Sequence, residues 1–438
     1  KDPNSQIYAI KRYEFETGEI KTITGGPGGA ARPQNSPNGK LLAFVKRVRT
    51  KTVLYIHELE TGLEYPVYDQ LNKDQMEAWC LFGVYTNFQW LPDNQHLIFW
   101  AGGKINKLNI KSLESKVIPF EAEVNLKIAK ALEFENPAYS DQFDVRVFRH
   151  AQTSPAGKTL VFSALGHLYS KALPKGKPQR ITDFTDFEFE PSFSPDGKQI
   201  VFVTWNDKEL GAIWKMNVDG TNQIKLNKAK GIFRTPRFSN SGQTIVYQKE
   251  GGNNDQGHTF SIEPGIYSIN ANGGELNMVC EQGQYPMFNA DDSRIFIQTG
   301  GHYFGNLTKQ LKSVDLNGYD ERTHISSKYA NRLLASPDNK WIAFTHLHKV
   351  YIAPIPPSGQ TLDLSDKSKS IPVAQVALDA GTNLHWSPNS QTLMWTLGNE
   401  YFKVDIEDRF TFLEGSPKEA PLPEKEGLEI GLVAKADK

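Results

Sequence analysis

Two histidines one residue apart, His346 and His348, have the spacing best suited to metal chemistry in this sequence. Two imidazoles on one face can bind a single divalent ion, provided that further ligands come from neighbouring strands. The pair follows the strand-like segment "WIAF" and precedes "KVYIAP", and only about 90 residues come after it. We therefore interpret it as a pair of histidines in a hairpin turn, and we predict no metal ligands.

Three other patterns fall short of a catalytic or phosphate-binding site. Residues 154–159, "SPAGKT", end like a phosphate-binding loop, but Gln152 stands where the first glycine is needed and a strand-like segment follows. Asp291 and Asp292 lack the glycine and distal glutamate of a calcium loop. No Gly-x-Ser-x-Gly elbow occurs, which excludes the usual serine-hydrolase arrangement. We predict no catalytic residues in this chain.

A long polar segment, residues 251–265 or "GGNNDQGHTFSIEPG", is the first candidate for binding. It expands a hairpin into a loop, and long loops on rigid scaffolds tend either to bind or to move in solvent. Asp255 and His258 are the candidate binding residues that it contributes. The alternative is a solvated loop with no ligand.

An insertion at residues 68–87, "YDQLNKDQMEAWCLFGVYTN", is the second candidate. Trp79, Phe82 and Tyr85 lie close together in it and could form a contact patch for a partner. The alternative is that these aromatic side chains pack into the core against a neighbouring repeat.

Both segments interrupt a repeat that runs through the chain, seen in "FEPSFSPDGKQIVFVTWND" and "LASPDNKWIAFTH". Aligned on the proline position of this motif, eight units begin their turn at Pro37, Pro92, Pro155, Pro195, Asn240, Ala290, Pro337 and Pro388. The steps between them are 55, 63, 40, 45, 50, 47 and 51 residues. Repeats of about 40–50 residues are typical of four-stranded propeller blades.

Each unit contains the parts of such a blade. A short strand leads into Ser-Pro-Asp-Gly-Lys, where the proline sets φ and Gly197 can take the positive φ of a tight hairpin. A second strand such as "QIVFVTW" carries β-branched and aromatic residues, and a third strand and a weaker edge strand follow. The sequence therefore predicts an all-β protein, a β-propeller of four-stranded blades.

The number of blades in a ring stays open. One ring of about eight blades fits residues 1–414; a six-bladed ring plus two blades of another ring fits equally, with a boundary in the insertion at 120–148. Nine third strands accompany eight first-and-second pairs, so either the N-terminal strands complete the last blade or the chain is cut from a longer protein. Residues 415–438 are expected to be a linker rich in proline and charge, then a trailing strand whose partner lies outside this chain.

Composition limits the classes of function. Of 438 residues, 49 are Lys or Arg and 50 are Asp or Glu, which gives a formal net charge of -1 and no basic excess for nucleic acid. No run of about 18 apolar residues occurs, so no membrane span is expected. The start, "KDPNSQIYAI", is expected to be that of a mature or excised form. Cys80 and Cys280 could form a bridge or remain two thiols.

The repeated Ser-Pro-Asp-Gly-Lys motif resembles the TolB-like propeller repeats, also called PD40 and WD40-like, of bacterial periplasmic proteins. A narrower similarity, in "GGPGGAARPQNSPNGKLLAFV", "DERTHISS" and "DAGTNLHWSPNSQTLMWTLG", links the chain to the propeller region that precedes an amidohydrolase domain in large exported bacterial proteins. This resemblance implies a periplasmic or otherwise exported location. The metal-dependent hydrolase barrel of such proteins has no counterpart in these 438 residues.

The resulting expectation is a non-catalytic propeller module of a periplasmic amidohydrolase-like protein, acting in substrate access or protein interaction. The alternative is a stand-alone TolB-like periplasmic protein-binding propeller. Hydrolase activity, and any divalent metal, would belong to a separate domain, and no cofactor is expected in this chain. The expected partner is another domain or envelope protein, a peptide or a small substrate.

Overall fold

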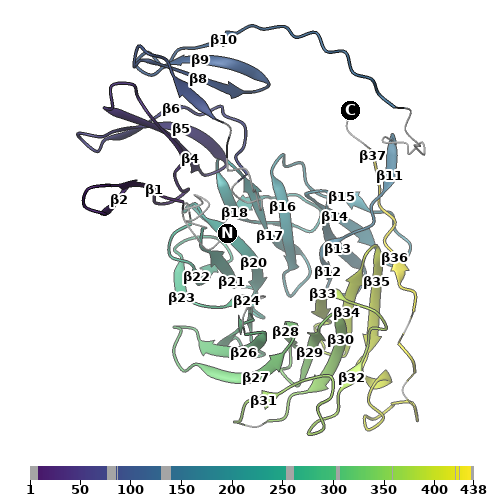
Figure 1. The fold of residues 1–438 in the computed structure, drawn as a ribbon. Coiled ribbons are helices and arrows are strands. Elements are labelled where there is room, and N and C mark those ends of the chain that lie inside the picture. Colours follow the sequence, from purple (N-terminus) through teal and green to yellow (C-terminus); the bar gives the residue numbers. More distant parts are fainter. Residues whose placement is uncertain are drawn as a thin grey trace. The chain divides into compact units, whose positions relative to one another are not determined.

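The structure, a computed structural model, describes residues 8–75, 85, 87–129, 140–252, 261–301, 306–357, 359–419, 421–423 and 425–435. The chain divides into two compact units. Unit 1 comprises Lys1–Glu135 and Gly251–Ile262, and unit 2 comprises Asn136–Glu250 and Glu263–Lys438. In both units the described residues form antiparallel sheets almost throughout (Figure 1).

Unit 1 contains a hairpin and two four-stranded sheets. The hairpin is β1 (Ile10–Tyr13) with β2 (Ile20–Thr24); the first sheet is β3 (Ala31–Asn35), β4 (Leu41–Val48), β5 (Lys51–Glu58) and β6 (Glu64–Tyr68); the second is β7 (Phe88–Trp90), β8 (His96–Ala101), β9 (Lys104–Asn109) and β10 (Ser115–Ile118). The two four-stranded sheets share one apolar core, in which Leu54 and Ile56 pack with Phe88 and Leu97.

Unit 2 contains six blades, each with its strands in antiparallel order from the inside outward. Blades 1 to 3 are β12 (Arg149–Thr153), β13 (Thr159–Ala164), β14 (His167–Ala172) and β15 (Gln179–Arg180); β16 (Phe187–Phe193), β17 (Gln199–Asn206), β18 (Leu210–Asn217) and β19 (Ile224–Lys225); and β20 (Ile232–Phe238), β21 (Thr244–Glu250), β22 (Gly265–Asn270) and β23 (Asn277–Cys280). Blades 4 to 6 are β24 (Gln284–Phe288), β25 (Arg294–Gly300), β26 (Thr308–Asp315) and β27 (Arg322–Lys328); β28 (Ala330–Ala335), β29 (Trp341–His346), β30 (Lys349–Pro354) and β32 (Ala374–Gln375); and β33 (Thr382–Trp386), β34 (Thr392–Leu397), β35 (Glu400–Asp405) and β36 (Leu428–Glu429). A short strand, β31 (Leu362–Asp363), adds in parallel to the edge of blade 4, and a 3-10 turn, Ile406–Asp408, follows β35.

The six blades close into a ring. Innermost strands contact one another in sequence, β12 with β16, β16 with β20 and β20 with β24, and β33 of the last blade returns to β12 of the first. The structure thus has the second arrangement left open by the sequence, a six-bladed ring in unit 2 and two further four-stranded sheets in unit 1. Neighbouring blades are held by apolar side chains: Val201 and Ile213 of blade 2 pack with Phe233 and Tyr247 of blade 3.

The motif turns have the predicted left-handed residue in all eight units. The residue two positions after the aligned proline position has a positive φ in every unit, from 58° at Asp292 to 74° at Gly242. Gly197 has a φ of 70°, which glycine adopts easily because it has no Cβ atom. At three of the four positions without glycine, the side chain accepts a hydrogen bond from the turn of the preceding blade. These bonds run from Asn38 N to Asn94 Oδ1 (2.8 Å), from Asn240 N to Asp292 Oδ1 (2.7 Å) and from Asp338 N to Ser390 Oγ (3.0 Å).

The C-terminal segment corrects one prediction. One trailing strand without a partner in this chain is the prediction from sequence, yet two short strands form and both are paired: β36 with β35 as the outer strand of blade 6, and β37 (Val433–Lys435) with β11 (Gln142–Asp144). The physical reason is burial: Ile430 and Leu432 enter the core beside Phe148, at 1% and 7% exposure. The outer edge of blade 6 is therefore occupied by β36.

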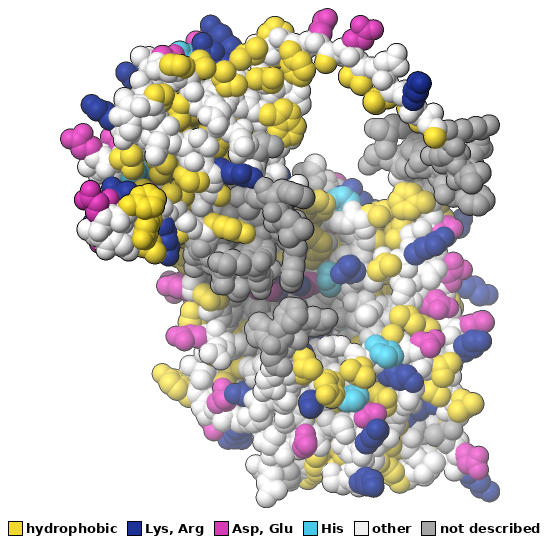
Figure 2. All heavy atoms as spheres, in the orientation of Figure 1, with side chains coloured by type: hydrophobic (Ala, Val, Ile, Leu, Met, Phe, Trp, Pro, Cys, Tyr) yellow, Lys and Arg dark blue, Asp and Glu magenta, His cyan; other side chains and the backbone are white. Residues whose placement is uncertain are grey.

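Charged side chains of both signs are interspersed over the face of the ring seen in Figure 2, in keeping with the formal net charge of -1. Within the described part of the chain, no helix has the length and apolar character needed to cross a membrane.

Candidate functional site

Two layers of six side chains line the channel at the centre of the ring. The upper layer lies five residues before the aligned proline position and comprises His150, Glu190, Thr235, Tyr285, Arg332 and Asn383. The lower layer lies three residues before it and comprises Gln152, Ser192, Arg237, Met287, Leu334 and His385. The upper layer lines a cavity of about 650 Å³ at the channel mouth, and the lower layer lines one of about 240 Å³ further along.

A β-bulge in each innermost strand places the upper layer. The pairing register shifts between the first and second strands of all six blades, which turns one extra side chain towards the channel. At five of the six upper-layer positions the bulged residue has a positive φ, from 49° to 56°, and none of the five is glycine. A side chain in this backbone region costs about 1–2 kcal/mol, so the fold holds these residues against local preference.

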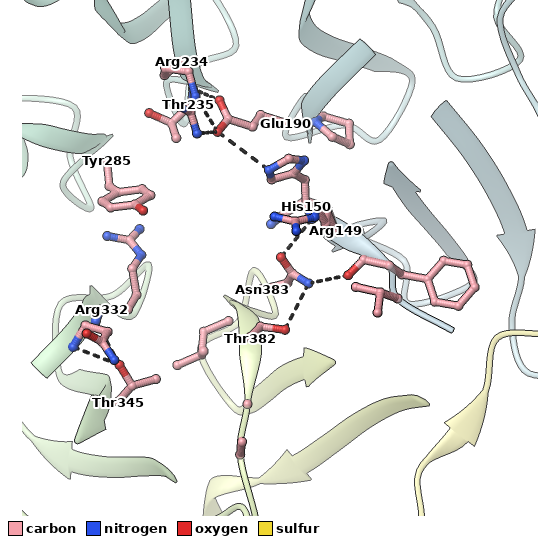
Figure 3. A pocket seen from close by; sticks show the side chains of 18 of the residues that line it. Arg149, His150, Glu190, Arg234, Thr235, Tyr285, Arg332, Thr345, Thr382 and Asn383 are labelled. Atoms are coloured by element: carbon pink, nitrogen blue, oxygen red, sulfur yellow. Dashed lines mark hydrogen bonds and ion pairs between the residues drawn. The ribbon is translucent and has the colours of Figure 1, made fainter. Parts of the chain in front are cut away.

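Glu190 is the centre of an ion-pair cluster at the mouth (Figure 3). Its Oε1 accepts hydrogen bonds from Arg234 Nε (2.9 Å) and Nη2 (2.7 Å), and lies 3.8 Å from His150 Nε2. Burial alone would lower the pKa of Arg234, but Glu190 and then Glu250 outweigh it and raise that pKa. Burial lowers the pKa of His150 although Glu190 opposes the shift, so His150 is neutral at pH 7.

Arg332 and Arg237 lie deeper and belong to both cavities. The guanidinium of Arg332 lies 4.2 Å from the ring centroid of Tyr285 and donates to Leu333 O at 3.2 Å. Its backbone N–H donates to Thr345 Oγ1 at 2.9 Å, which fixes the bulge. Arg237 Nη1 donates to Gln152 Oε1 at 3.0 Å. Burial, opposed by Tyr285 and assisted by Arg237, lowers the pKa of Arg332 to about 10, and burial also lowers the pKa of Arg237.

His385 belongs to the lower layer and joins the last blade to the first. Its Nδ1 donates to Asn383 O at 2.8 Å, which leaves Nε2 to accept from Thr153 N at 3.1 Å, with Thr153 Oγ1 at 2.8 Å. Burial, opposed by the bond to Asn383 and assisted by nearby Arg237, lowers the pKa of His385 to about 4. A neutral imidazole fixed by three contacts links the blades and is not free to exchange protons with a ligand.

Of the five residues expected from sequence to bind, Tyr85 alone lies in the described part of the chain. Trp79, Phe82, Asp255 and His258 lie outside the described residues. Tyr85 lies in the core of unit 1 at 7% exposure, where its hydroxyl accepts from Asn72 N (3.2 Å) and donates to Trp100 O (3.1 Å).

The histidine pair lies where the sequence places it, around the hairpin between β29 and β30. His346 Nδ1 is 3.6 Å from Asp366 Oδ1, and exposed His348 lines the mouth of the channel. The described residues contain no cluster of three or more His, Cys, Asp or Glu side chains placed to hold a metal ion. Cys280 has a free, half-buried thiol, and Cys80 lies outside the described residues.

The two channel layers were missed by sequence analysis, although the repeat contains a signal for them. In four units a residue-proline pair precedes the motif at a constant offset, as in "EPSFS", "TPRFS", "YPMFN" and "RPQNS". The residue before that proline is the bulged, left-handed one, for example Glu190, Thr235 and Tyr285. When the repeats are aligned on the motif, the position of this residue identifies the six upper-layer residues of unit 2.

Comparison with known proteins gives a family match for part of the chain. Residues 146–352 match the model of the TolB beta propeller domain. No curated protein matches the chain.

Similar solved structures include a putative TolB from Agrobacterium tumefaciens, with 14% identity over 72% of this chain and 87% of that chain and a TM-score of 0.29. TolB from Acinetobacter baumannii has 18% identity over 62% and 60% of the two chains, with a TM-score of 0.24. A gluconolactonase from Xanthomonas campestris has 15% identity over 60% and 86%, with a TM-score of 0.43. All three TM-scores are low, so the assignment of a TolB-like propeller fold depends on the family match and the strand topology.

Proposed function

We propose that this protein is a non-catalytic binding module and that the channel mouth of its six-bladed ring is the binding site. The observation that carries this proposal is the upper layer itself. Five side chains that are not glycine occupy left-handed bulge positions around one cavity of about 650 Å³. Backbone strain of this kind persists where the surrounding structure enforces it, and it clusters at functional sites.

The chemistry of the described lining residues favours binding over turnover. A nucleophile needs a base within hydrogen-bond reach and a third group that orients the base. Thr153 and His385 are within reach, but His385 is buried at 4% exposure and its imidazole is fixed between Asn383 and Thr153. Glu190 is held by Arg234, which leaves it unsuited to act as a general base.

The resemblance of several segments to propellers that precede an amidohydrolase domain supports a role in substrate access or protein interaction in a periplasmic, exported protein. In that setting the hydrolase chemistry and its divalent metal belong to a separate domain, and the channel mouth admits or screens the substrate. The alternative is a stand-alone TolB-like propeller that binds an envelope protein. The mass of the natural polypeptide separates the two: extension into a hydrolase domain supports the first, and an end near Lys438 supports the second.

Site-specific photocrosslinking tests the binding site. Leu347, 55% exposed, lies in the β29–β30 hairpin and lines the cavity, so a photoreactive amino acid at this position should capture the ligand or partner in cells of the source organism. Tyr319, 73% exposed in the turn between β26 and β27, is the matched control outside the channel. Equal capture at both positions, or none at Leu347, would show that the channel mouth is not the binding site.

A further inference from the structure

Two arginines in the channel have no close acidic partner, although the more distant charge of Glu190 opposes the lowering of the pKa of Arg237. Among the described residues no carboxylate oxygen lies within ion-pair distance of Arg237 or Arg332, whose side chains contact Gln152, Leu333 O and the face of Tyr285. Arg234, in the same cavity, has both Glu190 and Glu250. Arg234, at the rim, is therefore paired with carboxylates, whereas Arg237 and Arg332, inside the channel, have no carboxylate within ion-pair distance among the described residues.

Leaving these two guanidinium groups unpaired is costly. A partly desolvated charge destabilises a protein unless an opposite charge offsets it, and structural arginines in such places are normally paired. The cost here is visible in the lowered pKa of both groups, to about 10 for Arg332, which nonetheless remains charged at pH 7. Two donors of fixed, planar geometry in one narrow channel are complementary to an oxyanion that accepts from both.

We propose that the channel binds a carboxylate of its ligand between Arg237 and Arg332, the ligand being an acidic segment of a polypeptide that enters at the mouth. This inference rests on the proposed function and names the ligand class of the same site. Tyr285 holds the guanidinium plane of Arg332, and Thr345 Oγ1 holds its backbone. Arg234 is already engaged by Glu190 and Glu250, so Arg237 and Arg332 are the channel arginines left for the carboxylate of the ligand.

Isothermal titration calorimetry with matched peptides tests the inference. The probes are an acetylated, amidated Gly/Ser peptide with two Asp residues, the same peptide with Asn at both positions, and inorganic phosphate. We expect saturable binding of the Asp peptide and at least about tenfold weaker binding of the Asn peptide. Phosphate that binds as tightly as the Asp peptide would make this a phosphate site and overturn the carboxylate assignment.

Three variants locate the binding groups. Arg332→Gln and Arg237→Gln should each weaken the Asp peptide by at least about tenfold, since each removes a charge-assisted pair of donors. Arg322→Gln, at an arginine 58% exposed on the outer strand β27 and outside the channel, is the matched control and should change the affinity less than about threefold. Equal effects of all three would indicate only a general positive field.

Stability separates a ligand-binding role from a structural one. If Arg332 is kept for a ligand, Arg332→Met should leave the Tm unchanged or raise it, because a costly charge is removed. A lowered Tm or a failure to fold would show that Arg332 is structural and would overturn the inference. The proposed binding site is tested separately. If crosslinking from Leu347 persists in Arg332→Gln, the channel mouth remains the binding site, and only the assignment of a carboxylate ligand to Arg332 is rejected.

Discussion

The backbone N–H of Thr153 donates to Nε2 of His385 at 3.1 Å across the junction where the last blade meets the first. The two residues are 232 positions apart in the sequence, and they occupy equivalent innermost strands, β12 and β33. A second bond, from His150 N to Asn383 Oδ1 at 2.8 Å, joins the same strands one layer higher. Ring closure in unit 2 thus depends on side chains of the channel layers as well as on apolar packing between blades.

The first prediction concerns the pH dependence of this closure. Because the folded-state pKa of His385 lies at about 4, below the ordinary 6.5, the unfolded chain binds the proton more readily. The contribution of His385 to stability is therefore complete above pH 6.5 and is lost as the pH falls towards 4. The total is about 3 kcal/mol, of which about 2.4 kcal/mol is lost between pH 7 and pH 4.5 and can be measured there by denaturant unfolding.

His385→Gln removes the titrating group and should flatten this pH dependence while lowering stability at pH 7 by about 1–2 kcal/mol. The control is His348→Gln, at an exposed histidine of the channel mouth, which should retain the pH profile of the unaltered protein. An unchanged pH profile in His385→Gln would contradict the assignment.

The second prediction concerns the bonds between motif turns. Asp292 accepts from Asn240 N (2.7 Å) and Ser241 N (2.9 Å) of the preceding blade while its own φ is 58°. Asp292→Ala removes both bonds, together with a third from Asn240 Nδ2 (2.9 Å), and keeps the unfavourable φ, so unfolding free energy should fall by about 2 kcal/mol. Asp292→Gly removes the same bonds but tolerates the φ, and should cost about 1 kcal/mol less. Equal losses, measured in urea, would exclude a role for the backbone conformation.

The strands and turns could be predicted from sequence because their determinants are local. Gly197 and its equivalents mark a turn whose conformation depends on four or five neighbouring residues, and the segment that became β17, "QIVFVTWN", is apolar enough to be a doubly covered strand by itself. Even Ser390, which departs from the glycine of the motif, takes the expected φ, at 61°.

Partners and closure could not be predicted, because they depend on contacts between distant residues. Alternation in "LEIGLVAKADK" identifies a strand, but nothing local shows that Ile430 is buried beside Phe148. The number of blades in a ring follows from packing between blades. The repeat period does not reveal it, because one ring of about eight blades and a six-bladed ring with two further blades have nearly the same period. Likewise, the channel layers are visible only once the innermost strand and its bulge are known.

The third prediction concerns the C-terminal segment as part of the ring. Lys171, 6% exposed, donates from Nζ to Glu429 O and Ile430 O, both at 2.8 Å, and Ile430 is 1% exposed. Ile430→Ala should therefore destabilise unit 2 by about 2–4 kcal/mol, and amide exchange of residues 428–432 should accelerate. Val433→Ala, at a position 56% exposed on β37, should cost less than about 0.5 kcal/mol. An Ile430→Ala variant as stable as Val433→Ala would show that the segment does not contribute to the ring.

The fourth prediction concerns a buried ion pair in unit 1. Arg47 donates from Nε to Asp74 Oδ2 at 3.0 Å and from Nη2 to Oδ1, and Thr52 Oγ1 donates to Oδ2 at 2.7 Å; the side chains of Arg47 and Asp74 are 1% and 2% exposed. Asp74→Asn removes the carboxylate charge from this buried pair, which should destabilise unit 1 by about 3–5 kcal/mol. Asp69→Asn, which breaks the exposed pair between Lys51 and Asp69, should cost less than about 1 kcal/mol. Hydrogen exchange of peptides from β4 to β6 measures both effects, and equal protection in the two variants would show that burial of the Arg47 pair does not set the stability of unit 1.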